Sequence, residues 1–190
     1  METVTADIHR YLIERCLEQD RKAQFQIYKL YSDAMYNVCY RMLKREEDAQ
    51  DVLQEAFVDA FTKLHTFRFD AAFGSWLKRI VINRCINALQ KRKLLTINVE
   101  ERKLAHIPDD TETDESEIEW EIGQVRRCMD KLPEGARVVL NLYLFEGYDH
   151  AEIAEILNIT ESTSKAQYSK ARKRLREMIT EERAALWKIS

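Results

Sequence analysis

Turn-forming residues are scarce in this sequence of 190 residues, which contains two prolines and four glycines. An all-β chain of this length would need many tight turns, and Gly and Pro are the residues that such turns use most. Hydrophobic residues make up 45% of the chain, which is enough to build buried cores. The sequence therefore predicts an all-α protein made of long helices.

Apolar residues recur at steps of three and four along the first half of the chain. The clearest periodic segments are residues 25–42, 47–64 and 74–93, and a weaker one covers residues 8–17. This spacing places the apolar side chains of each segment on one face of a helix. We therefore expect residues 1–95 to form one helical domain.

A change of composition separates this half from the rest of the chain. Residues 96–117 lose the apolar periodicity, contain Pro108 and end in a run of acidic side chains that would repel one another in a compact segment. We expect a flexible acidic linker here. Helical periodicity returns in residues 118–190, so we expect two small helical domains joined by this linker.

The clearest local motif lies in the second domain. Asp149 and Glu152 have the spacing of a capping box that starts a short helix, and Asn158 follows in a tight turn. Thr160 then suits the N-cap of a longer, basic helix. These elements form a helix-turn-helix, whose second helix enters the major groove of DNA. The side chains of that helix expected to contact DNA are Ser162, Thr163, Lys165, Gln167, Lys170 and Arg174.

An ordinary helical hairpin with a solvated basic face is the alternative for this segment. Small hydroxyl and amide side chains gather at the start of the longer helix, where they can approach base edges and phosphates without steric bulk. A merely solubilising face would not need them. DNA binding is therefore the favoured interpretation.

The distribution of charge along the chain agrees with DNA binding, although the net charge does not. The net charge is −3, which by itself speaks against a nucleic-acid-binding protein. Residues 76–93 and 162–176, however, each carry six basic side chains and no acid, and an acidic stretch lies between them. Two separated basic segments indicate two DNA-contacting surfaces.

An acidic row lies on the helix expected at residues 47–64. Asp48, Asp51, Glu55 and Asp59 follow one another at steps of three, four and four, so they share one face. Neighbouring like charges destabilise a helix by roughly 0.2–0.5 kcal/mol per pair. A basic binding partner would explain such a row, and a solvated acidic face is the alternative.

The next helix has the opposite character. Asn83, Arg84, Asn87 and Lys91 lie opposite its apolar face. Asparagine is a poor helix former, so its use on an exposed helical face favours hydrogen bonding to nucleic acid.

The break before that helix is dense in aromatic side chains. Phe67, Arg68 and Phe69 are candidates for holding an unpaired base, since stacking contributes roughly 1 to 3 kcal/mol per base. Phe73 and Trp76 are expected to lie in the core instead.

Three stretches of the chain resemble the extracytoplasmic-function sigma factors, the smallest sigma subunits of bacterial RNA polymerase. They are residues 48–57 (DAQDVLQEAF), residues 73–83 (FGSWLKRIVIN), and residues 132–175 from Leu-Pro-Glu through the helix-turn-helix. The resemblance covers both expected domains in the right order. It implies a protein that binds core RNA polymerase and directs promoter-specific initiation of transcription.

The resemblance also assigns a role to each surface. The acidic helix would bind the clamp helices of the polymerase β-prime subunit, the residues concerned being Asp48, Asp51, Gln54 and Glu55. The first domain would recognise and melt the minus-ten element, the residues concerned being Phe67, Arg68, Phe69, Asn83, Arg84, Asn87 and Lys91. The helix-turn-helix would read the minus-thirty-five element as duplex. The β subunit of the polymerase and an anti-sigma factor are further partners that the resemblance implies.

Some positions depart from the family pattern. Ser164 replaces an apolar residue, Gln167 replaces an arginine, and Asn87 stands where an aspartate is common. The family's base preference is therefore not transferred to this chain.

No enzymatic, metal or cofactor site is expected. The histidines are dispersed, and no Ser/His/Asp or metal-ligand spacing occurs. Cys16, Cys39, Cys85 and Cys128 are far apart, which is typical of reduced and mostly buried thiols.

The expected location is the cytoplasm. Nothing resembles a signal peptide, and no apolar stretch is long enough to cross a membrane. A stand-alone helix-turn-helix regulator is the main alternative function, but it would leave the acidic row and the asparagine-bearing helix unexplained.

Overall fold

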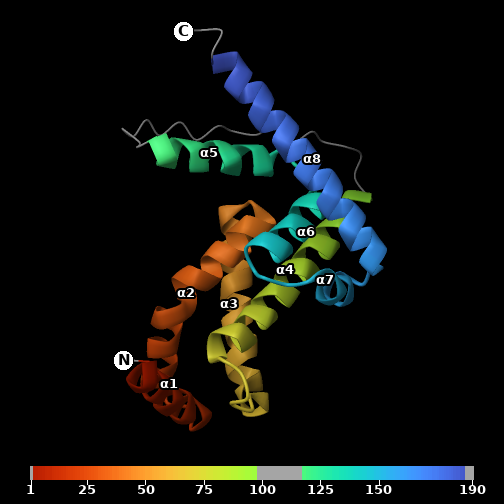
Figure 1. The fold of residues 1–190 in the computed structure, drawn as a ribbon. Helices are drawn as coiled ribbons and strands as arrows, with labels where there is room; N and C mark the ends of the chain where they lie inside the picture. The colour runs from red at the N-terminus through yellow and green to blue at the C-terminus, as the bar shows by residue number, and fades with distance from the viewer. Residues whose placement is uncertain (1, 98–116, 187–190) are drawn as a thin grey trace. The chain divides into compact units, whose positions relative to one another are not determined.

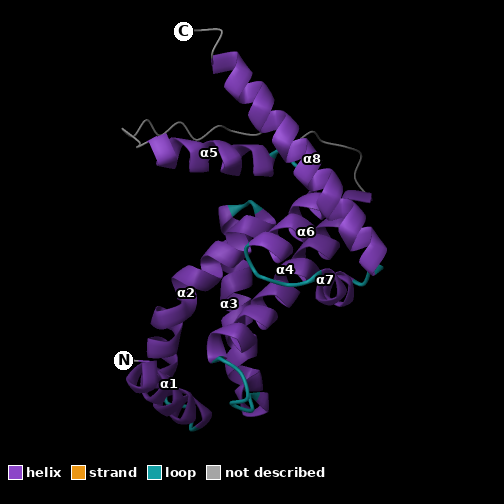
Figure 2. Cartoon of the chain, viewed as in Figure 1, coloured by secondary structure: helices purple, strands orange, loops and turns teal. Residues whose placement is uncertain are grey.

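The computed structural model describes residues 2–97 and 117–186, and every regular element in these ranges is helical (Figure 2). The chain divides into two compact units, Met1–Glu100 and Glu101–Ser190. The all-α prediction is confirmed. The expected acidic linker falls largely on residues 98–116, which lie outside the described residues.

The first unit is built from four long helices and one short turn of 3-10 helix (Figure 1). These elements are α1 (Glu2–Leu17), α2 (Arg21–Leu43), α3 (Glu46–Lys63), η1 (Leu64–Thr66) and α4 (Phe73–Ile97). Helix α2 packs against α1, α3 and α4, and α3 packs against α4. The apolar faces of the helices meet in a core that includes the fully buried side chains Ile27, Met42, Leu43, Leu77 and Val81.

Local signals explain where α2 begins and ends. The Asp20 carboxylate accepts a hydrogen bond of 2.8 Å from the backbone N–H of Lys22, which caps the helix N-terminus. Lys44 ends the helix in the left-handed conformation with φ of 61°. Arg45, the N-cap of α3, is extended, so the chain reverses over two residues and α3 returns along α2.

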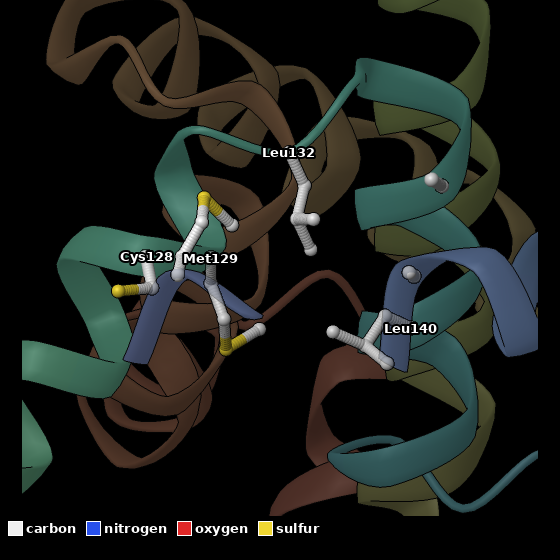
Figure 3. Close-up of a cluster of buried hydrophobic side chains, with 7 residues drawn as sticks. Cys128, Met129, Leu132 and Leu140 are labelled. Atoms are coloured by element: carbon white, nitrogen blue, oxygen red, sulfur yellow. The ribbon is translucent and has the colours of Figure 1, made fainter. Parts of the chain in front are cut away.

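The second unit contains α5 (Glu117–Asp130), α6 (Glu134–Leu144), α7 (His150–Leu157) and α8 (Glu161–Leu186). Helix α8 contacts each of the other three (Figure 1). Side chains from α5, α6, α8 and the turn between α5 and α6 form its core, in which Met129, Leu132 and Leu140 point toward one another (Figure 3). Ala171 and Met178 complete this core from α8.

The expected helices all occur, with shifted ends. Helix α4 runs to Ile97, past the expected end of its segment at residue 93. All four cysteines are buried, as expected. No helix within the described ranges is long and apolar enough to cross a membrane.

Candidate nucleic-acid and protein interfaces

The caps of the helix-turn-helix form as the sequence predicts. The Asp149 carboxylate accepts a hydrogen bond of 2.8 Å from the Glu152 backbone N–H, and the Glu152 carboxylate accepts one of 2.8 Å in return. Asn158 takes the left-handed conformation that ends α7, with φ of 52°. Thr160 Oγ1 then accepts a hydrogen bond of 3.1 Å from the Thr163 backbone N–H at the start of α8. Residues close together in the sequence therefore end α7 and begin α8, which leaves a tight turn between the two helices.

Helix α8 carries exposed basic side chains on two flanks. Lys165 and Lys170 are both exposed, and five residues of α-helix place them about 140° apart around the axis. Lys165 forms an ion pair of 2.6 Å with Glu161, whereas Lys170 forms none among the described residues. Arg174 is exposed and lies 3.7 Å from Glu177. Cations on both flanks suit a helix lying in a groove between two phosphate backbones.

Helix α8 also carries two predicted DNA-contacting hydroxyl side chains and three further exposed cations. Ser162 and Thr163 are exposed at the N-terminus of α8, where their hydroxyls bond to Thr160 Oγ1. The interpretation from sequence did not include three more exposed cations of α8, Arg172, Lys173 and Arg176. Their presence in the basic segment 162–176 was the signal that could have found them.

Gln167 differs in burial from the other α8 side chains predicted to contact DNA. Its side chain is half-buried, and its amide packs on the backbone of α6. A Cβ added to Gly135 would lie only 3.2 Å from Gln167 Oε1, so the glycine makes room for this contact. The Gln167 amide therefore lies against the first turn of α6.

Ser164 has a polar partner inside the helix-turn-helix. It is fully buried, and its Oγ lies 2.9 Å from His150 Nδ1. The His150 ring stacks on Tyr143 with ring centroids 4.7 Å apart. Sequence reasoning missed this contact, because the hydroxyl replaces an apolar side chain and its partner is 14 residues away.

The predicted polymerase-binding residues lie on α3 in different environments. Asp51 and Gln54 are exposed, and Asp51 forms no ion pair with any described residue. Asp48 is half-buried and forms an ion pair with Arg92 of α4. Val58, which the sequence interpretation missed, lies one turn beyond Gln54 and is 66% exposed.

A shallow groove of about 320 Å³ runs between α2 and α3, beside this exposed face. Tyr28, Ser32 and Tyr36 line it from α2, and Gln50 and Gln54 line it from α3. The groove therefore adjoins Gln54, one of the predicted polymerase-binding residues of α3.

Arg84 of α4 is paired with the acidic row of α3. Its Nε and Nη2 donate to the two carboxylate oxygens of Asp59 at 2.7 and 2.6 Å, and its Nη1 lies 3.1 Å from Glu55 Oε2. These hydrogen bonds from Arg84 hold the pKa of Asp59 below its ordinary value, although burial opposes them. The basic partner of the acidic row is thus partly supplied by the chain itself.

The exposed face of α4 presents a row with a regular step of four. Arg79, Asn83, Asn87 and Lys91 are all exposed, and we call them the α4 row. Arg79 was not among the expected contacts, although stepping back four positions from Asn83 reaches it. Neither Arg79 nor Lys91 forms an ion pair with another described residue.

The residues of the aromatic break that were predicted to hold an unpaired base differ in exposure. Phe67 is 8% exposed, and its ring packs 5.4 Å from Trp76 and 5.5 Å from Phe73. It belongs to the core, because only burial removes its large apolar surface from water, and it is not available to an unpaired base. Phe69 is 38% exposed at a φ of 59°. The Arg10 guanidinium lies 5.1 Å from the Phe69 ring centroid, and Arg68 is exposed.

Phe73 is buried, as expected, whereas Trp76 is half-buried. In the described part of the chain, no group of three His, Cys, Asp or Glu side chains is placed to hold a metal ion.

Comparisons with known proteins agree with this architecture. The family model for Sigma-70 region 2 matches residues 27–94, and that for Sigma-70, region 4 matches residues 122–175. Both units therefore carry a segment of the class of proteins that direct RNA polymerase to promoters.

Full-length relatives narrow the class. The chain is 31% identical over 161 residues to the ECF RNA polymerase sigma factor SigM of Mycobacterium tuberculosis, covering 84% of this chain and 79% of that protein. It is 29% identical over 176 residues to the ECF RNA polymerase sigma factor SigW of Bacillus subtilis, covering 88% and 94%. The protein belongs to the ECF RNA polymerase sigma factors, which are DNA-binding factors of transcription initiation.

Solved structures support the fold. The sigma factor RpoE in complex with the anti-sigma factor NepR from Bartonella quintana matches with a TM-score of 0.57 at 20% identity, covering 82% of this chain and 95% of that one. CnrH in complex with the cytosolic domain of CnrY matches with a TM-score of 0.54 at 22% identity, covering 90% and 96%.

Proposed function

We propose that this sigma factor attaches to core RNA polymerase through α3, opens the minus-ten element with α4 and the loop before it, and reads the minus-thirty-five element with α8. The observation that carries the proposal is the opposition of two faces in the first unit. An exposed acidic and amide face on α3 lies beside a basic and amide face on the neighbouring helix α4.

The proposed polymerase surface consists of Asp51, Gln54 and the exposed side of Glu55, with Val58 at its C-terminal end. The unpaired carboxylate of Asp51 and the exposed carboxylate of Glu55 attract a basic partner, and the exposed Val58 beside them adds apolar contact. Asp48 forms an ion pair with Arg92 and therefore contributes less to the binding of polymerase. The partner that fits this surface is a positively charged helix, as the clamp helices of the β-prime subunit are expected to be.

The minus-ten surface consists of the α4 row with Arg68 and Phe69. Asparagine amides can both donate to and accept from the edges of unpaired bases. Lys91 and Arg79 can follow the phosphate backbone, and the partly exposed Phe69 ring can stack on a base. Phe67 and Arg84 are left out, because Phe67 is buried and Arg84 is engaged by α3.

The minus-thirty-five surface is the N-terminal half of α8. Ser162 and Thr163 lie at the helix N-terminus, where small hydroxyl groups can approach the groove. Lys165, Lys170 and Arg174 supply the charge that binds phosphates on either side.

Further partners follow from the family. In one similar solved structure the sigma factor RpoE is in complex with the anti-sigma factor NepR, and in another CnrH is in complex with the cytosolic domain of CnrY. We extend the expectation of an anti-sigma partner to this protein. The β subunit of the polymerase is the partner proposed for the second unit, and the cytoplasm is the proposed location.

Promoter-specific transcription by core RNA polymerase, measured with and without the purified protein, tests the proposal. We expect the protein to bind core polymerase and to produce new, defined start sites on DNA from its own genome. A stand-alone regulator would instead bind duplex DNA without binding core polymerase. Absence of both core binding and new start sites would refute the sigma function.

A further inference from the structure

Two residues expected to serve different partners are bonded to each other. Glu55 belongs to the face proposed to bind polymerase, and Arg84 lies beside the asparagines proposed to bind the minus-ten strand. Arg84 Nη1 lies 3.1 Å from Glu55 Oε2. Asp59 binds the remaining edge of the same guanidinium at 2.6 and 2.7 Å. All three guanidinium nitrogens therefore point at carboxylates of α3.

The charge of this group makes Arg84 a poor ligand for phosphate. One guanidinium and two carboxylates sum to −1, and Lys63, whose Nζ is 3.6 Å from Asp59, brings the sum to zero. A DNA phosphate approaching Arg84 would also approach Glu55 and Asp59. Arg79 and Lys91 differ, since they are exposed and form no ion pair within the described residues.

The two carboxylates are not equivalent. The Glu55 side chain is 61% exposed, whereas that of Asp59 is 20% exposed. Asp59 holds Arg84 by two parallel hydrogen bonds, a geometry stronger than a single contact. A basic side chain of the polymerase can therefore take Glu55 while Asp59 keeps Arg84. The lowered pKa of Asp59 agrees with a firm pair.

The pair also lies at the middle of the α4 row. Arg84 adjoins Asn83 in the sequence and precedes Asn87 by three residues. Arg92, two turns further along α4, pairs with Asp48 at the other end of α3. Two cross-links between antiparallel helices limit both the sliding and the rotation of α4 against α3.

We propose that Arg84 is a positioning residue rather than a DNA contact, and that Asp59 anchors it so that α4 presents Asn83 and Asn87 to the unpaired strand while α3 is bound to polymerase. This inference rests on the proposed sigma function. It predicts that Asp59, which faces neither partner, is needed for promoter opening.

A double-mutant cycle separates positioning from direct contact. The variants are Asp59→Asn, Arg84→Met and the two combined, each as the full chain assembled with core polymerase. Two quantities are measured: the affinity for core polymerase, and the rate of open-complex formation on a linear template whose start site was mapped with the wild-type holoenzyme.

If Arg84 positions α4, both single variants slow opening by about tenfold and the double variant is no slower than either, because residues acting as one unit are not additive. Core affinity stays within about threefold, since Asp51 and Gln54 are intact. Arg84→Lys retains the charge and should keep more of the opening rate than Arg84→Met.

Direct contact predicts a different pattern. If Arg84 bound phosphate, Asp59→Asn would release its guanidinium and speed opening, whereas Arg84→Met would slow it and lower the salt slope by about one unit. Opposite signs, additive losses, or no loss in either single variant overturn the inference.

Control variants and folding measurements separate a loss of positioning from a loss of folding. Lys63→Met removes the ion pair of 3.6 Å between Lys63 and Asp59 but leaves both hydrogen bonds from Arg84 to Asp59 in place, so it should leave opening unchanged. Helicity and the thermal midpoint of each variant are measured, and if Arg84→Met does not fold, Asp59→Asn and Arg84→Lys still decide the sign. If the wild-type chain fails to bind core polymerase, the proposed function itself fails and the inference falls with it.

Discussion

Ser164 Oγ and His150 Nδ1 lie 2.9 Å apart, and this hydrogen bond ties the second helix of the helix-turn-helix to the first. The His150 ring also stacks on Tyr143 and meets the edge of Tyr168 at 5.5 Å between centroids. One histidine thereby links α6, α7 and α8. The angle between α7 and α8 depends on these contacts.

Replacing either residue of this pair should lower the free energy of unfolding of the second unit. We expect Ser164→Ala to destabilise the unit by about 1 kcal/mol, the net value of one hydrogen bond. His150→Ala should cost more, because it also removes the aromatic contacts. Urea unfolding of the full chain, monitored by a probe in α8, measures the loss. Equal stability of His150→Ala and wild type would contradict the proposed link.

Asp51 offers a clean test of the polymerase surface. It is exposed and forms no ion pair with a described residue, so Asp51→Arg reverses a charge without breaking an internal contact. We expect core affinity to fall by at least about tenfold, since like charges across an interface repel. Asp70→Arg is the matched control, because Asp70 is an exposed acid outside α3 that also forms no ion pair with a described residue. A similar loss for both variants would mean that net charge, not the α3 surface, controls binding.

The two basic flanks of α8 should differ in their salt dependence. Lys170→Ala should lower the salt slope of duplex binding by about one unit, as expected for the loss of one phosphate contact. Lys165→Ala should lower it less, because Glu161 already neutralises part of its charge at 2.6 Å. Fluorescence anisotropy at several salt concentrations gives both slopes. A larger change for Lys165 than for Lys170 would reverse our assignment.

Phe67 and Phe69 should separate stability from strand binding. Phe67→Ala should destabilise the first unit by about 3–5 kcal/mol, the range for removal of a buried phenylalanine. Phe69→Ala should leave stability nearly unchanged and weaken binding of a single-stranded minus-ten oligonucleotide by the holoenzyme. Thermal unfolding and oligonucleotide titration distinguish the two. The opposite pattern would return Phe67 to the DNA-binding surface.

Acid should loosen the contact between α5 and α8. Lys131 donates a hydrogen bond of 2.7 Å to Glu182, which lowers the pKa of that carboxyl below its ordinary value of 4.5, although burial opposes the shift. A lowered folded pKa stabilises the unit above pH 4.5, and this stabilisation is lost as the pH falls through the folded value. We expect Glu182→Gln to reduce stability at pH 7 and to flatten its decline in acid, measured by urea unfolding between pH 7 and pH 3. An unchanged acid profile would rule out this contribution.

The sequence by itself determined the helices, their caps and the helix-turn-helix. Each of these depends on residues within about four positions of one another, as with Asp149 and Glu152, whose reciprocal bonds form as expected. The acidic row and the asparagine-bearing face could also be predicted from the sequence, because helical periodicity alone places residues on a common face.

Tertiary structure alone decided which of those residues remain available to a partner. Arg84 is bonded to Asp59, 25 residues away, and Arg92 to Asp48, 44 residues away, so two cations of the basic segment face α3. Phe67 is buried and Gln167 is half-buried for the same reason, since the side chains and backbone that cover them come from other elements. A sequence pattern assigns a side chain to a face of its helix, but the neighbouring helix determines whether that face is open.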